Sequence, residues 1–300
     1  MIDYQIDFAG VLLGPGTVYP IGDVTGLGAP ELRTQDVDLA TEDGALPGVD
    51  LYRPRVVGIE AGIRTPGDPA AAASALAALN RAAATPTARL SAGALQTLLI
   101  RWPGHEARQL YGRVRRVETV STRQSIHGWI PIALEFTATD PSWHSPVLRR
   151  KGLPLAHTPG TGFRAPITAP ISTGVAVPEE RPGWLDNAGD RPAWPTITIT
   201  GPVVNPRIRI AETSSVLDLQ LDLADGQTLV IETRPGTRTV LRDGVNASGA
   251  LSVVSRLDLF TVPPGRSEIR WTGANYTNRT RLSIAWHDAH TTLGGDPRWR

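Results

Sequence analysis

The side chains best suited to binding a metal ion lie together near the C-terminal end of the sequence. His287, Asp288 and His290 follow an alternating apolar segment and could offer two imidazole nitrogens and a carboxylate. A structural metal site usually takes a fourth ligand. The neighbouring sequence supplies none, and the chain has no cysteine. We therefore expect solvated residues at the end of a strand, with no metal ion and no cofactor.

Acidic side chains raise the question of glycoside hydrolysis, which uses a pair of carboxyl groups. Asp218, Asp222, Asp225 and Glu232 are the candidates. The first two alternate with leucines, so they are expected on the solvent face of a strand, whereas general acid catalysis needs a desolvated carboxyl group. The histidines are scattered without the spacing that nucleophilic catalysis requires. The sequence predicts no catalytic residue and no enzyme.

Tryptophan is the residue type that points most clearly to binding. The chain holds eight, and an indole can stack on a sugar ring as well as fill a core. Trp271 and Trp286 share their phase with neighbouring isoleucines, which favours the core for both. Trp184 and Trp194 remain as candidate carbohydrate-contacting residues. The alternative is that they fix a linker to the domain that follows.

The elements that hold these side chains are expected to be mainly strands. The sequence contains 30 glycines and 26 prolines among 300 residues, and helical periodicity is scarce. One alanine-rich segment, 69–84, is the exception. Asp68 stands at its N-cap position and Pro69 at its first helical position, so a single helix is predicted there.

The N-terminal domain is expected to span residues 1–147 as a β-barrel or split barrel with that helix against it. Its clearest strand is 130–138, where isoleucine, leucine, phenylalanine and alanine alternate with more polar residues. Further strands are expected at Ile2–Phe8, Glu31–Leu39, Arg55–Ile63, Leu95–Trp102 and Leu110–Glu118.

The remaining sequence divides into a linker and a second β domain. Residues 148–194 are rich in proline and show little alternation, which indicates a linker that includes an extended first strand. Alternation returns over 195–300, so a β-sandwich or jelly roll is predicted there. Turn signals separate its strands at Asp225-Gly226, Pro235-Gly236, Asp243-Gly244 and Pro264-Gly265.

Charge and composition exclude several classes of protein. A formal net charge of +1 does not favour binding to nucleic acid, so no sequence-specific nucleic-acid partner is expected. No apolar run is long enough for a membrane span, and the N-terminal residues lack the features of a signal peptide. The absence of cysteine fits synthesis in a reducing cytoplasm.

Two groups of motifs resemble the distal tail proteins of siphophages, the phages with long non-contractile tails. The first is Phe136-Thr137-Ala138-Thr139-Asp140-Pro141-Ser142-Trp143, which is similar to the segment that closes their N-terminal domain. His144 follows where the family often has an aromatic residue. The second group lies in the C-terminal domain and comprises Asn187–Asp190, Pro195–Gly201, Asn205-Pro206, Asp243-Gly244 and Pro263–Gly265.

This resemblance implies a galectin-like or carbohydrate-module-like sandwich behind a ring-forming domain. It implies a homo-hexameric ring at the virion tail tip, between the tail tube protein and the hub or tail-associated fibre protein, made in the bacterial host cytoplasm. The predicted helix and the arginines 113, 115 and 116 are hypotheses for ring contacts or lumen. The alternative function is a lectin-like module that binds host cell-surface glycan, on a phage or a related injection particle.

Overall fold

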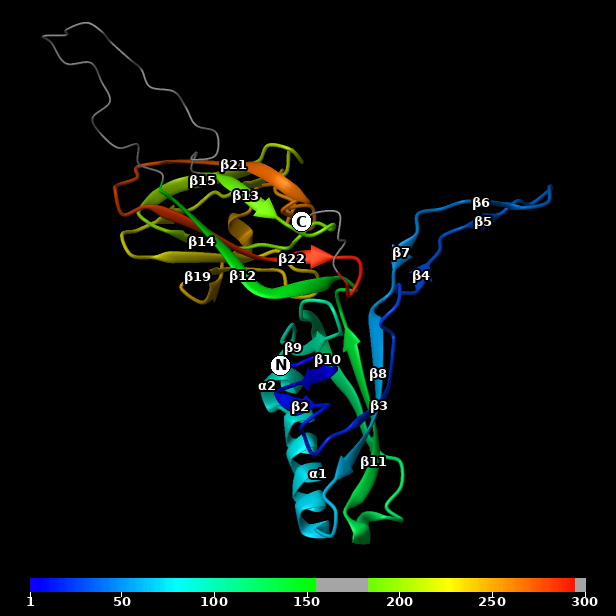
Figure 1. Ribbon diagram of the computed structural model, residues 1–300. Coiled ribbons are helices and arrows are strands. Elements are labelled where there is room, and N and C mark those ends of the chain that lie inside the picture. The colour runs from blue at the N-terminus through cyan, green and yellow to red at the C-terminus, as the bar shows by residue number, and fades with distance from the viewer. Residues whose placement is uncertain (155–182, 295–300) are drawn as a thin grey trace, which may run out of the picture. The chain divides into compact units, whose positions relative to one another are not determined.

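The computed structural model describes residues 1–154 and 183–294 (Figure 1). The fold is mainly β, as predicted, and every ladder whose register the structure describes is antiparallel. The chain forms two compact units, 1–146 with the residues from 290 onward, and 147–289. Within the described ranges no helix combines the length and apolar character needed to span a membrane.

The first unit is built on one antiparallel sheet. Its strands follow the order β2, β1, β9, β10, β11, β8, β3. No ladder joins the edge strands β2 and β3 in the described part of the chain, so the sheet is open, which is compatible with a split barrel. The strands are β1 Gln5–Phe8, β2 Val11–Leu13, β3 Ile21–Thr25, β8 Arg55–Arg64, β9 Gln96–Arg101, β10 Arg108–Thr119 and β11 Trp129–Ala138.

Helix α1 spans Pro69–Ala83, one residue shorter than predicted. The Asp68 carboxylate accepts a hydrogen bond from the Ala71 amide at 2.8 Å, as an N-cap residue should. Ala72 and Leu79 are its buried residues, and the Tyr19 hydroxyl donates to the Ala75 carbonyl. A second, short helix, α2 (Pro86–Leu90), follows where the sequence predicted only one helix.

Strands β3 and β8 are joined by a long two-stranded arm, residues 31–54, that extends away from the sheet (Figure 1). Short ladders join β4 (Leu32–Arg33) to β7 (Leu51–Tyr52) and β5 (Val37–Asp38) to β6 (Ala45–Leu46). Every residue of the arm is exposed except Leu39. The prediction of Glu31–Leu39 as a strand of the barrel is therefore wrong, because this segment pairs only within the arm.

The core of the first unit lies between the sheet and α1. Strand β11 buries every second residue, as its alternation predicted, and it pairs with β8 over its whole length, from Trp129 opposite Arg64 to Ala138 opposite Arg55. Phe8 and Phe136 meet edge to face, with ring centroids 6.4 Å apart. Trp143 is the largest side chain that is fully buried.

The second unit holds two antiparallel sheets with one hydrophobic core, as a sandwich does. The glycines of all four predicted turns have positive φ, which suits glycine. One sheet contains β13 Trp184–Asn187, β21 Gly265–Ala274, β15 Val203–Ile210, β16 Val216–Asp218 and β17 Asp222–Leu223. The other contains β22 Arg281–His290, β14 Thr196–Thr200, β18 Thr228–Glu232, β19 Thr239–Arg242 and β20 Val245–Asn246.

The expected linker, 148–194, differs from the structure at both ends. Strand β12 runs from Trp143 to Pro154 and is a neighbour of β22, and β13 pairs with β21. Both ends therefore contribute strands to the second unit, because proline at a strand end leaves the ladder intact. The middle of the predicted linker, 155–182, lies outside the described residues, as do residues 295–300.

Candidate functional site

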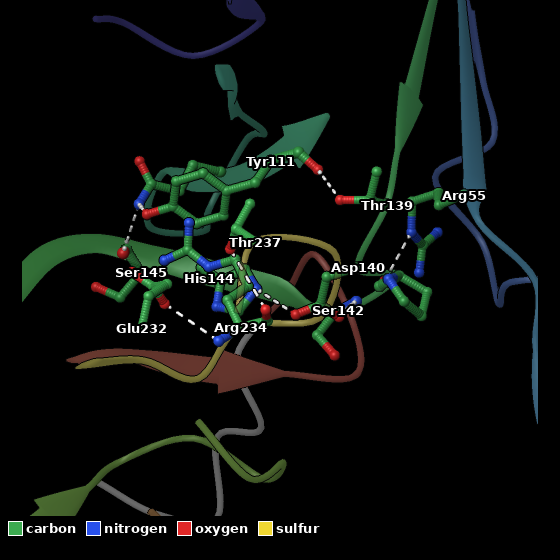
Figure 2. A network of polar contacts seen from close by, with 12 residues as sticks. Arg55, Tyr111, Thr139, Asp140, Ser142, His144, Ser145, Glu232, Arg234 and Thr237 are labelled. Atoms are coloured by element: carbon green, nitrogen blue, oxygen red, sulfur yellow. Dashed lines mark hydrogen bonds and ion pairs between the residues drawn. The ribbon is translucent and has the colours of Figure 1, made fainter. Parts of the chain in front are cut away.

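The segment from Asp140 to Ser145 follows β11 and contains the start of β12, and it surrounds a buried carboxylate (Figure 2). One Asp140 carboxylate oxygen accepts the Ser142 amide at 3.0 Å, which forms the turn predicted at Asp140-Pro141. The other lies 3.0 Å from His144 Nε2. Asp140 and His144 are 4% and 2% exposed, so the pair is shielded from water.

The pKa of Asp140 is lowered from its ordinary value of 3.8. Burial raises it, but the hydrogen bond and charge of His144 and the hydrogen bonds from Ser142 together outweigh burial. The carboxylate is thus held in its charged form by its neighbours. A buried carboxylate that accepts these hydrogen bonds stabilises the turn.

The aromatic residue of the motif packs back on the N-terminal unit, as the sequence predicted. The Arg55 guanidinium lies 5.0 Å from the centroid of the Trp143 ring. Arg55 also donates to the carbonyl of Pro141 at 3.0 Å and to that of Gly26 at 2.9 Å. Arg55 therefore fixes both the turn and the strand end from which the arm leaves.

His144 also makes an aromatic contact. Its ring meets Tyr111 edge to face at 5.2 Å between centroids. The Gln109 side chain donates to the Tyr111 hydroxyl and to the Ser145 carbonyl. Gln109 and His144 are also opposite each other in the β10–β12 ladder. These side chains form a packed polar network, which sequence reasoning did not assemble because its members come from two strands, β10 and β12, that are far apart in the sequence.

The two candidate carbohydrate-contacting residues, Trp184 and Trp194, are both half-buried. The Arg266 guanidinium lies 4.4 Å from the Trp184 ring centroid, and the Arg238 guanidinium lies 5.7 Å from that of Trp194. Each indole therefore has an arginine over one face. A sugar ring would have to stack on the opposite face.

The other two tryptophans of the sandwich belong to its core, as predicted. Trp286 is 4% exposed, and Trp271 packs against the same core while partly exposed.

The acidic and histidine candidates do not form a reactive cluster. The expectation that Asp288 is a solvated strand-end residue is wrong, because Asp288 is buried and its carboxylate forms an ion pair with the Arg149 guanidinium at 2.6 Å. Glu232 accepts hydrogen bonds from Thr196 and Arg234, and Asp225 pairs with Arg279 on the surface. Across residues 1–154 and 183–294, no group of three or more histidine, aspartate or glutamate side chains is arranged to hold a metal ion.

The arginines of the predicted ring contact lie on β10. Arg113 donates to the carbonyls of Ser91 and Ala94, and Arg116 pairs with Glu118 at 3.2 Å. A register shift between Val114 and Arg116 leaves Arg115 without an opposite residue on β11, and Arg115 is exposed. We call Arg113, Arg115 and Arg116 the arginine strand.

Comparison with known proteins gives two findings. Residues 188–289 match the family described as siphovirus-type tail component, C-terminal domain. No curated protein matches the sequence.

Three solved structures resemble nearly the whole chain. The Dit protein of phage SPP1, described as a paradigm of the hub adsorption apparatus in phages that infect Gram-positive bacteria, superposes with a TM-score of 0.57 at 14% identity, over 95% of this chain and 98% of that one. The phage P2 baseplate activated with Ca has a chain with a TM-score of 0.55 at 10% identity, over 95% and 98%. A chain of the phage p2 baseplate activated with Sr superposes with a TM-score of 0.53 at 10% identity, over 94% of this chain and 97% of that one.

Proposed function

We propose that this chain, which carries the C-terminal domain of the siphovirus-type tail components on the fold of the Dit proteins, is a structural component of a phage tail tip. The observation that carries the proposal is the extent of the likeness to Dit, 95% of this chain and 98% of the other. Both units and their order in the chain are thereby included. We assign the protein to the virion, after synthesis in the host cytoplasm.

The finer proposal is a homo-hexameric ring formed by the N-terminal unit. Identical contacts between different patches of a protein repeat until the ring closes. In such a ring the protein lies between the tail tube protein and the hub or tail-associated fibre protein. The buried Asp140 network supports a scaffold role, since its polar groups bond to one another and present no reactive group to solvent.

The mass of the purified protein, measured by light scattering, tests the ring. The proposal predicts a single species of six subunits. A protein that stays monomeric over the full range of concentrations would contradict it.

A second proposed role is adhesion of the sandwich to host glycan. The observation in its favour is that Trp184 and Trp194 are only half-buried. Binding of host cell-wall polysaccharide should fall at least tenfold in Trp184→Ala or Trp194→Ala and stay unchanged in Trp102→Ala, a half-buried tryptophan of the other unit. Equal binding by all three variants would contradict the role.

A further inference from the structure

The arm, residues 31–54, protrudes from the first unit and is almost entirely exposed. A two-stranded ribbon is at best marginally stable alone in water, yet the arm contacts solvent on both faces. Its exposed apolar side chains include Val37, Leu46 and Val49, with exposed fractions of 62%, 59% and 66%. Such side chains on a protruding element mark a surface that another molecule covers.

The arm is also strongly acidic. Residues 34–52 hold five acidic side chains and no basic one: Asp36, Asp38, Glu42, Asp43 and Asp50. All five are exposed. The rest of the chain is therefore positively charged overall, because the formal net charge of the whole is +1. The surface that covers the arm should carry arginines.

The arginine strand has the properties of that surface. β10 pairs with β9 only as far as Gly112, so beyond it one edge of β10 has no ladder in the described structure. Arg115 and Arg116 are exposed there, and Val120, directly after the strand, is 62% exposed. An open strand edge with such side chains can receive an extended segment of another chain.

The arm of a molecule does not lie on its own arginine strand. It leaves the sheet at Arg55, which pairs with Ala138 of β11, and Ala138 in turn pairs with Gly112. From Gly112, β10 runs to Thr119, opposite Ile132, so it leads away from the base of the arm. The arm itself extends beyond the other end of the sheet (Figure 1). The two surfaces can therefore meet only between different copies.

We propose that the arm of one copy docks on the arginine strand of the next copy. Its carboxylates pair with Arg115 and with Arg116, which exchanges its ion pair with Glu118 for the arm, and its apolar side chains cover Val120. This contact joins two different patches, so it continues from copy to copy. The inference rests on the proposed ring, for which it names the contact.

Charge reversal on each surface tests the contact. Variant A is Asp38→Lys with Asp43→Lys, and variant B is Arg115→Glu with Arg116→Glu. Each variant alone should be monomeric by light scattering, because like charges then meet. An equimolar mixture of A and B should recover the mass of the wild-type oligomer, since every arm then meets an opposite charge in an alternating assembly. A control, Asp186→Lys with Asp222→Lys, reverses two exposed charges of the second unit and should assemble as the wild type does.

The outcomes separate the two proposals. If variants A and B each form the wild-type oligomer, the arm contact is overturned and the ring stands. The same holds if both variants are monomeric and their mixture does not recover the oligomer. A wild-type protein that is monomeric at low salt would overturn the ring and the contact together.

Discussion

At the scale of single residues, Asp140 shows how a short motif closes a domain. One of its carboxylate oxygens accepts a hydrogen bond from the Ser142 amide, and the other lies 3.0 Å from His144 Nε2. Both contacts are shielded from water. The sequence predicted the turn from Asp140-Pro141 and the return of Trp143 to the barrel. The sequence could not predict the contact between His144 and Tyr111, because the register of β10 and β12 decides which of their residues meet.

Asp140→Asn should lower the free energy of unfolding at pH 7 by about 1–3 kcal/mol, the cost of weakening a buried hydrogen-bonded charge. The folded-state pKa of Asp140 lies below 3.8. The contribution of its charge is therefore complete above pH 3.8 and is lost as the pH falls through the folded-state pKa.

Urea unfolding at pH 7 and at pH 3 should accordingly show a smaller difference between wild type and variant at the lower pH. Asp186→Asn, at an exposed position of β13, is the control and should match the wild type at both. A difference that grows on acidification would contradict this account of Asp140.

Arg149→Met should destabilise the second unit more than the double variant Arg149→Met with Asp288→Leu. Arg149 is 41% exposed, whereas the Asp288 side chain is 6% exposed. Removing Arg149 leaves a buried charge unpaired, at a cost of about 1–3 kcal/mol after allowance for solvent at Arg149. A double-mutant cycle by urea unfolding measures the coupling free energy between Arg149 and Asp288. The prediction is contradicted if the losses of unfolding free energy in the two single variants add up to the loss in the double variant.

At the scale of elements, alternation predicted the strands that have a core on one face. β11 and β14 show this best, since both bury every second residue. The same signal failed for the arm, because alternation does not reveal whether a core is present to receive the apolar face. It also failed at β13, whose Trp184–Asn187 span is too short to show a period.

Gly112→Ala should destabilise the N-terminal unit by about 1–3 kcal/mol. A methyl group there would lie 2.1 Å from the Thr137 carbonyl oxygen of β11, which the ladder holds in place. Gly152→Ala is the matched control, since nothing lies within 4 Å of its added carbon. Thermal unfolding that is equal for the two variants would show that β10 and β11 can separate without cost.

Replacing residues 34–50 by Asn-Gly should leave the stability of the monomer within about 0.5 kcal/mol of the wild type, as for a surface change. Arg33 and Leu51 are already paired, so a two-residue turn can join them. No fully buried side chain is removed. A loss of several kcal/mol in urea unfolding would mean that the arm supports its own fold and is not reserved for another molecule.

At the scale of the whole molecule, the mainly β fold was predictable from sequence, and so was the resemblance to the distal tail proteins. The positions of the expected ring contacts were less predictable. The arginines of β10 and the predicted helix stay hypotheses for those contacts, whereas the segment Glu31–Leu39 of the arm was predicted as a strand of the barrel. Contacts between copies of a protein are made by exposed residues, and exposed residues show no apolar periodicity in the sequence.

Negative-stain imaging of the purified protein tests the central claim most directly. A tail-tip scaffold predicts class averages with sixfold symmetry around a central opening. Particles of monomer size, or open filaments without a closed ring, would contradict the account.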